Sequence, residues 1–93
     1  MYATVRTYAG TKGMADALVE HEGDVKSLIT GISGFQAYYL IKTSDGAVSI
    51  SVYNDQSGAE ESTRQAADWM RENLADFAAS PPQVSVGEVV IQA

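Results

Sequence analysis

The sequence predicts a single α+β domain in which a four-stranded antiparallel sheet carries two helices on one face. Three observations lead to this prediction. Four segments have the composition or the alternation of strands, two longer segments have apolar residues at helical spacing, and the elements follow the order β-α-β-β-α-β. Right-handed crossovers then place both helices on the same face of the sheet. The chain of 93 residues suffices for one such domain, which we expect to span residues 1–93.

The first part of the chain is expected to form a strand and a helix. Residues 2–8 are rich in threonine, valine and tyrosine, which favour strands, and Gly10 and Gly13 follow them. Residues 14–29 carry apolar side chains at helical spacing with charged residues between them, which predicts one continuous helix. Gly31 is positioned to end this helix, because glycine adopts the left-handed conformation that terminates many helices.

Two strands over residues 35–43 and 47–53 are expected to form a hairpin. Asp45-Gly46 lies between them and is typical of a two-residue type I′ turn, in which both residues have positive φ. Ser44 pairs with Ala47 in that register, and alternation sends successive side chains to opposite faces. The face expected to meet the core carries Phe35, Ala37, Tyr39, Ile41, Val48, Ile50 and Val52, and the other carries Gln36, Tyr38, Leu40, Lys42, Ser49, Ser51 and Tyr53.

The second helix is expected to begin after Ser57, because Ser57 and Glu60 match a capping box. It is predicted to continue to about Ala79, since the following Pro81-Pro82 cannot prolong a helix. A last strand is predicted over residues 84–91, with a bulge at Gly87-Glu88, where its alternation slips. The residues expected on the inward side of the helix are Ala59, Ala66, Trp69, Met70, Asn73 and Phe77.

Charge and composition exclude several classes of function. Twelve acidic and six basic side chains give a net charge of −6, and the basic residues are scattered, so we expect no nucleic-acid binding. The chain has no cysteine, which excludes disulfides and thiolate chemistry. No apolar run reaches the roughly 18 residues of a membrane-spanning helix, and no signal-peptide pattern is visible. We therefore expect no membrane partner and a cytoplasmic location.

A set of short motifs lies in the middle of the chain. They are Gly34-Phe35-Gln36-Ala37-Tyr38-Tyr39, Asp45-Gly46 and Ser51-Val52-Tyr53-Asn54-Asp55, followed by an acidic helix start. In this order they resemble the antibiotic biosynthesis monooxygenase-like superfamily, whose members are dimeric α–β barrels of ferredoxin-like fold. The resemblance implies that fold and a homodimer in which the open sheet faces of two subunits pack together. Tyr53 stands where many members have tryptophan, so a function tied to that tryptophan is not implied.

The homodimer also agrees with the expected open face, which carries Tyr38, Leu40 and Tyr53. One small domain does not cover such a face by itself, whereas a second copy would do so.

His21 is the only histidine and lies on the apolar side of the first predicted helix, where it should point toward the sheet. It is the candidate base, with Tyr39 as the second catalytic candidate. Trp69, Met70 and Asn73 share one side of the second helix and are candidate ligand contacts. The alternative for each of these residues is an ordinary structural side chain. No second histidine or cysteine completes a metal site and no glycine-rich phosphate loop is present, so we expect neither a metal nor a cofactor.

No motif in the chain specifies a reaction, so the expected function follows from the resemblance. The superfamily includes cofactor-independent oxygenases, haem-degrading enzymes and isomerases. The resemblance implies a cofactor-independent monooxygenase or isomerase that acts on a small aromatic or enolisable compound. His21 would remove a proton, and Tyr39, Trp69 and Asn73 would hold the resulting anion. The alternative is a non-catalytic dimer that binds a small ligand or has a structural role.

Overall fold

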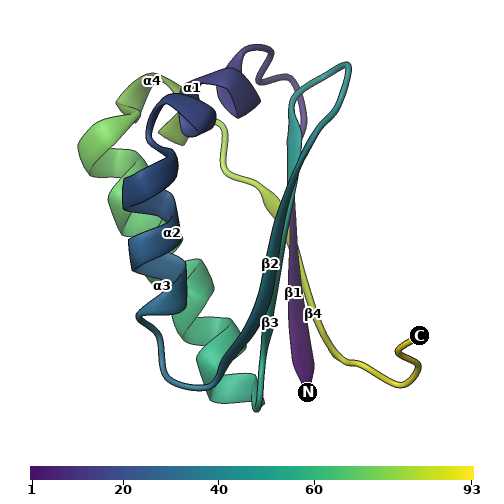
Figure 1. Ribbon diagram of the computed structural model, residues 1–93. Helices are drawn as coiled ribbons and strands as arrows, with labels where there is room; N and C mark the ends of the chain where they lie inside the picture. The colour runs from purple at the N-terminus through teal and green to yellow at the C-terminus, as the bar shows by residue number, and fades with distance from the viewer.

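The computed structural model describes residues 1–93 and contains one antiparallel sheet with its strands in the order β2-β3-β1-β4. All the helices cover one face of the sheet, and the other face is open (Figure 1). This arrangement confirms the predicted α+β, ferredoxin-like fold. No helix is both long enough and apolar enough to cross a membrane. The elements are β1 (Tyr2–Tyr8), α1 (Met14–Glu20), α2 (Glu22–Thr30), β2 (Phe35–Lys42), β3 (Ala47–Tyr53), α3 (Gln56–Asn73), α4 (Ala75–Ala78) and β4 (Gln83–Glu88).

Each of the two predicted helices is divided by one residue that leaves helical geometry. His21, with φ −107° and ψ 26°, separates α1 from α2. Leu74, with φ −134° and ψ 55°, separates α3 from α4. The apolar spacing continues across both breaks, which is why the sequence pattern predicted two continuous helices.

The first turn of α3 is capped by Asp55, so the predicted capping box with Ser57 as N-cap is wrong. The Asp55 carboxylate accepts the backbone N–H of Gly58 at 3.0 Å and the Ser57 hydroxyl at 2.8 Å. These hydrogen bonds, that of Gly58 first, lower the pKa of Asp55 from its ordinary value. The predicted bulge at Gly87-Glu88 is also wrong, because β4 pairs with β1 without interruption as far as Glu88.

The hairpin turn lies one residue earlier than predicted. Lys42 pairs with Ala47, and the Thr43 N–H donates to the Gly46 carbonyl oxygen at 3.1 Å. Gly46 does not have positive φ, so the predicted type I′ turn is wrong. Glycine is required there for space, because a Cβ at this position would lie 1.9 Å from the carbonyl oxygen of Tyr8.

The faces of the hairpin are the reverse of the prediction except at Phe35. Tyr38 and Leu40 pack against the core, whereas Tyr39 is 61% exposed on the open face. A bulge between Phe35 and Ala37 lets Phe35 and Tyr38 both face the helices. The helix-covered face carries Thr4, Arg6, Tyr8, Tyr38, Leu40, Ser49, Ser51 and Tyr53, and the open face carries Val5, Ala37, Tyr39, Ile41, Val48, Ile50 and Val52.

The core between sheet and helices consists of two small clusters. One contains Tyr8, Met14, Leu18 and Met70, and the other contains Ile29, Ile32, Tyr53 and Ala59. Tyr38, Leu40 and Tyr53, which were predicted to meet a second subunit, belong to these clusters or pack against them. The prediction assumed that the more apolar side of the hairpin faces inward, whereas in the structure the covered side is the one that also holds the buried Arg6 of β1.

Candidate functional site

Arg6 lies in the middle of β1 and its side chain extends under the helices, where it is 2% exposed. Nη2 donates to the hydroxyls of Ser49 at 2.9 Å and Ser51 at 2.7 Å. Nη1 donates to the hydroxyls of Ser62 at 3.2 Å and Thr63 at 3.1 Å. No carboxylate forms an ion pair with the guanidinium, and its Nε–H has no partner. Because an unpaired buried charge is costly, this arrangement is suited to holding a negative charge.

Two buried tyrosines lie near this guanidinium. Burial raises the pKa of Tyr53 to about 12 and also raises the pKa of Tyr8, although the positive charge of Arg6 opposes both shifts. The Tyr53 hydroxyl donates to the carbonyl oxygen of Ile29 at 2.7 Å. Both phenols are therefore neutral at physiological pH, and neither supplies the negative charge that Arg6 lacks.

Two cavities meet at Arg6. The smaller, of about 30 Å³, lies between the two core clusters, and the larger, of about 260 Å³, lies between α3, α4, the Pro81-Pro82 segment and β4. Arg6, Tyr8 and Met70 line both cavities. The larger one is suited to a compound of roughly one or two fused rings, since drug-sized ligands occupy somewhat bigger pockets. No aspartate, glutamate or histidine lines either cavity.

Three of the predicted site residues lie on or beside these cavities. Met70 lines both of them, and Trp69 lines the smaller one. The His21 ring packs edge-on against Trp69 with a centroid separation of 5.4 Å, and its Nδ1 lies 3.7 Å from a carboxylate oxygen of Asp24. His21 contacts Trp69 but lines neither cavity.

The other two predicted site residues lie elsewhere. Tyr39 is on the opposite face of the sheet, so it does not share a pocket with His21 within one chain. Asn73 is exposed at the end of α3, and its side-chain amide donates to the backbone oxygen of Trp69 at 3.0 Å. Its predicted inward position is wrong, because that local hydrogen bond holds the amide at the surface.

The sequence prediction missed Arg6 as a site residue. A signal was present, since Arg6 pairs with Ser49 and Thr4 pairs with Ser51 on the neighbouring strand. Small hydroxyl residues at alternate positions opposite a strand arginine provide hydrogen-bond acceptors for a buried guanidinium.

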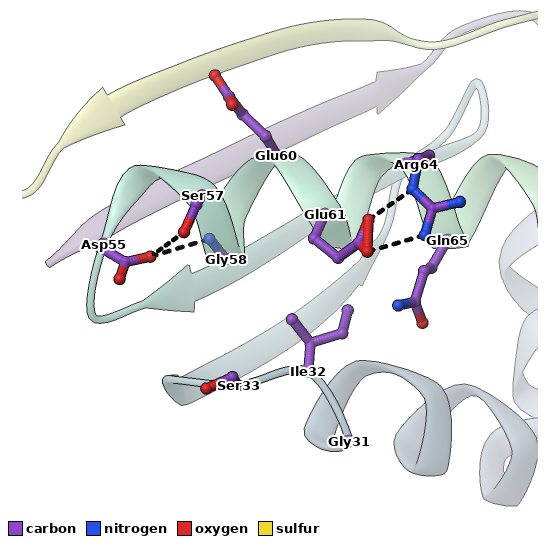
Figure 2. A pocket seen from close by; sticks show the side chains of 10 residues that line it. All are labelled: Gly31, Ile32, Ser33, Asp55, Ser57, Gly58, Glu60, Glu61, Arg64 and Gln65. Atoms are coloured by element: carbon purple, nitrogen blue, oxygen red, sulfur yellow. Dashed lines mark hydrogen bonds and ion pairs between the residues drawn. The ribbon is translucent and has the colours of Figure 1, made fainter.

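A third hollow, an open groove of about 640 Å³, lies outside the sheet–helix core (Figure 2). It runs between the loop after α2 and the first turns of α3. Arg64 Nε lies 2.5 Å from Glu61 Oε1, and Asp55 is occupied in capping α3, as the dashed lines in Figure 2 show. The Arg64 hydrogen bond lowers the pKa of Glu61. These charged groups are paired with neighbours, in contrast to Arg6, so the groove shows no group held for a ligand.

Comparison with known proteins finds similarity in structure alone. No family model and no curated protein matches the sequence. Solved structures that match include a protein of unknown function from Nitrosomonas europaea, with 22% identity and a TM-score of 0.71 over 99% of this chain and 90% of that chain. A putative antibiotic biosynthesis monooxygenase from Bordetella bronchiseptica has 16% identity and a TM-score of 0.72, with 97% of each chain covered.

A third matching structure is SnoaB, a cofactor-independent oxygenase from Streptomyces nogalater. It has 14% identity and a TM-score of 0.56 over 99% of this chain and 92% of that chain. At these identities the likeness shows the fold. It confirms, at the level of the fold, the resemblance to the antibiotic biosynthesis monooxygenase-like superfamily that the sequence predicted.

Proposed function

We propose that this chain is a cofactor-independent oxygenase acting on a small enolisable or phenolic compound in the cavity between α3, α4 and β4. The proposal rests mainly on one observation. The larger cavity extends from exposed residues such as Arg71 and Val84 to the buried Arg6 and Tyr8, so it joins the surface to the buried guanidinium. The shared fold with a protein named as a cofactor-independent oxygenase supports the proposed class of reaction.

The chemistry requires an electron-rich substrate, because without a cofactor the substrate itself must reduce O₂. Its enolate or phenolate form supplies the electrons, and a methylene beside the charged centre becomes a carbonyl. The step consumes one O₂, places one oxygen atom in the product and releases the other as water. Arg6 stabilises the anion by its positive charge, and Met70 and Phe77 form apolar walls of the cavity that keep water from it.

His21 as the base stays a prediction, because the imidazole contacts Trp69 and does not line a cavity. If His21 removes the substrate proton, His21→Leu should lower turnover by the roughly 100-fold typical of a lost general base. Turnover that is unchanged in this variant would exclude the role and leave a structural histidine that packs on Trp69.

The alternative function is a small-ligand carrier without turnover. One observation favours it: the larger cavity has no carboxylate or imidazole in its lining to act as a base. A carrier would bind the same compounds and consume no oxygen.

We further propose that the chain forms a homodimer through its open sheet face. Val5, Tyr39 and Ile50 lie side by side across the three strands β1, β2 and β3. Such a contiguous apolar surface is unusual on a monomer, and a second copy would bury it. No helix covers this face (Figure 1).

Oxygen uptake with 1,3-indanedione tests the proposed reaction. This two-ring compound ionises readily at its methylene carbon, and its oxidation to the trione consumes one O₂ and releases one water. We expect protein-dependent uptake together with trione formation. Ala67→Trp, at the exposed mouth of the larger cavity, should block entry and abolish both, whereas Ala75→Trp, outside the cavity, should not.

Absence of uptake with indanedione bound would contradict the oxygenase and support the carrier. Equal activity in the two tryptophan variants would mean that the reaction takes place elsewhere.

A further inference from the structure

We propose that the larger cavity is built for a ligand that is already an anion when it arrives, and that the buried guanidinium of Arg6, which lines this cavity, is the positive charge that the ligand compensates. The ligand class is an aromatic compound of one or two rings with a carboxylate or an enol acidic enough to be ionised in neutral water. This inference rests on the proposed function in placing the ligand in the same cavity, and it adds the charge of the ligand and the group that recognises it.

The hydrogen bonds of Arg6 leave one donor free. A guanidinium has five N–H groups, and the four on Nη1 and Nη2 suffice for Ser49, Ser51, Ser62 and Thr63. These hydroxyls hold the guanidinium in place but carry no charge. Nε is buried without a partner, so both a hydrogen bond and a negative charge are missing at this position.

The surroundings do not supply that charge. The lining of both cavities contains no carboxylate, and burial keeps Tyr8 and Tyr53 protonated. The lining also contains no group that would take a proton from a neutral ligand. A ligand that enters as an anion needs no such group, and its charge would compensate a guanidinium in a medium of low dielectric constant.

The rest of the larger cavity suits an aromatic ring. Phe77, Pro81, Pro82 and Val84 contribute apolar surface around it. Arg71 also lines the cavity, but it is exposed and paired with Asp68, which reduces its attraction for a ligand. Arg6 is therefore the group that distinguishes an acid from a neutral compound of the same shape.

Binding of 1-hydroxy-2-naphthoate and of its neutral amide, 1-hydroxy-2-naphthamide, tests this inference by calorimetry at neutral pH. We expect the naphthoate to bind the wild-type protein at least tenfold more tightly than the amide. Arg6→Met should remove this preference, and Arg64→Gln, on the outer groove, should keep it. Because binding is measured without oxygen uptake, a carrier and an oxygenase give the same result here.

A second measurement on the wild-type protein avoids the risk that Arg6→Met does not fold. The chain has three arginines, so the Nε–H signals of Arg6, Arg64 and Arg71 can be assigned by NMR with Arg64→Gln and Arg71→Gln. The Arg6 signal should move on addition of the naphthoate and not on addition of the amide. Equal binding of the two probes, or an unmoved Arg6 signal, would overturn the inference while leaving the cavity as a site. Binding of neither probe would overturn the inference and would also contradict the proposed ligand cavity.

Discussion

The two faces of the sheet differ in a way that hydrophobicity alone does not explain. The face under the helices carries polar groups such as Arg6, Ser49 and Ser51, all nearly inaccessible to solvent. The open face carries apolar groups such as Val5 and Ile50 at its centre. In most sheets that are covered on one side, the apolar side chains are the covered ones.

Hydrophobic packing within one chain therefore accounts for neither face of the sheet. On the covered face, hydroxyls surround a guanidinium that has no counter-ion, and we interpret this costly arrangement as one that serves a ligand. On the open face, the exposed apolar surface would be buried by a second copy of the chain.

The largest effect is expected from Gly46→Val, because Gly46 lies where the hairpin turn packs closely against the end of β1. A Cβ there would lie 1.9 Å from the Tyr8 carbonyl oxygen, so the strands must separate. We expect a loss of about 3 kcal/mol in the free energy of unfolding, measured by urea denaturation. Gly23→Ala is the control, because a Cβ there meets nothing within 4 Å. An unchanged midpoint for Gly46→Val would contradict the described register.

A smaller effect of opposite sign is expected when the whole polar cluster of the covered face is replaced. Arg6→Met combined with Ser49→Ala and Ser51→Ala should raise the free energy of unfolding by about 2 kcal/mol, since apolar residues suit a dry site. Ser51→Ala alone should lower it by about 1 kcal/mol, because a charged donor at 2.7 Å loses its acceptor. Urea denaturation measures both variants. Destabilisation by the triple replacement would show that the cluster serves stability rather than a ligand.

The smallest effect concerns the pH dependence of stability through Tyr53. Its pKa is about 12 when folded and about 10 when unfolded, so the unfolded chain loses this proton first. The free energy of unfolding should therefore fall as pH rises from about 10, and the fall should end near pH 12. At pH 11 the contribution is about 1 kcal/mol. Urea denaturation at pH 8 and pH 11 should show a smaller difference for Tyr53→Phe than for wild type. If the difference in unfolding free energy between the two pH values is the same for both proteins, the Tyr53 hydroxyl must be exposed to water.

The order and most ends of the elements were predictable because they depend on local signals. β1 and β3 have the predicted ends, since residues 2–8 and 47–53 are rich in strand-forming types bounded by glycine or polar residues. The helix breaks at His21 and Leu74 were not predictable, because the apolar spacing continues across both of them.

The faces of the sheet, and with them the site, were not predictable from alternation. Alternation separates the two sets of side chains correctly but does not say which set the helices cover. The Arg6 guanidinium on the covered face bonds hydroxyls more than 40 positions away in the sequence, and such contacts are not visible in the alternation. Trp69 and Met70 line the cavities because they belong to the inward side of one regular helix, and their role as ligand contacts stays a prediction.

The most direct test of the contrast between the faces is sedimentation equilibrium at micromolar concentration with one charged replacement on each face. Wild type should have twice the chain mass. Ile50→Lys, on the open face, should have the mass of one chain and keep its helical circular dichroism, whereas Leu40→Lys, which enters the core, should lose that signal. A wild-type monomer would contradict the account, and so would a folded monomer of Leu40→Lys beside an unfolded Ile50→Lys.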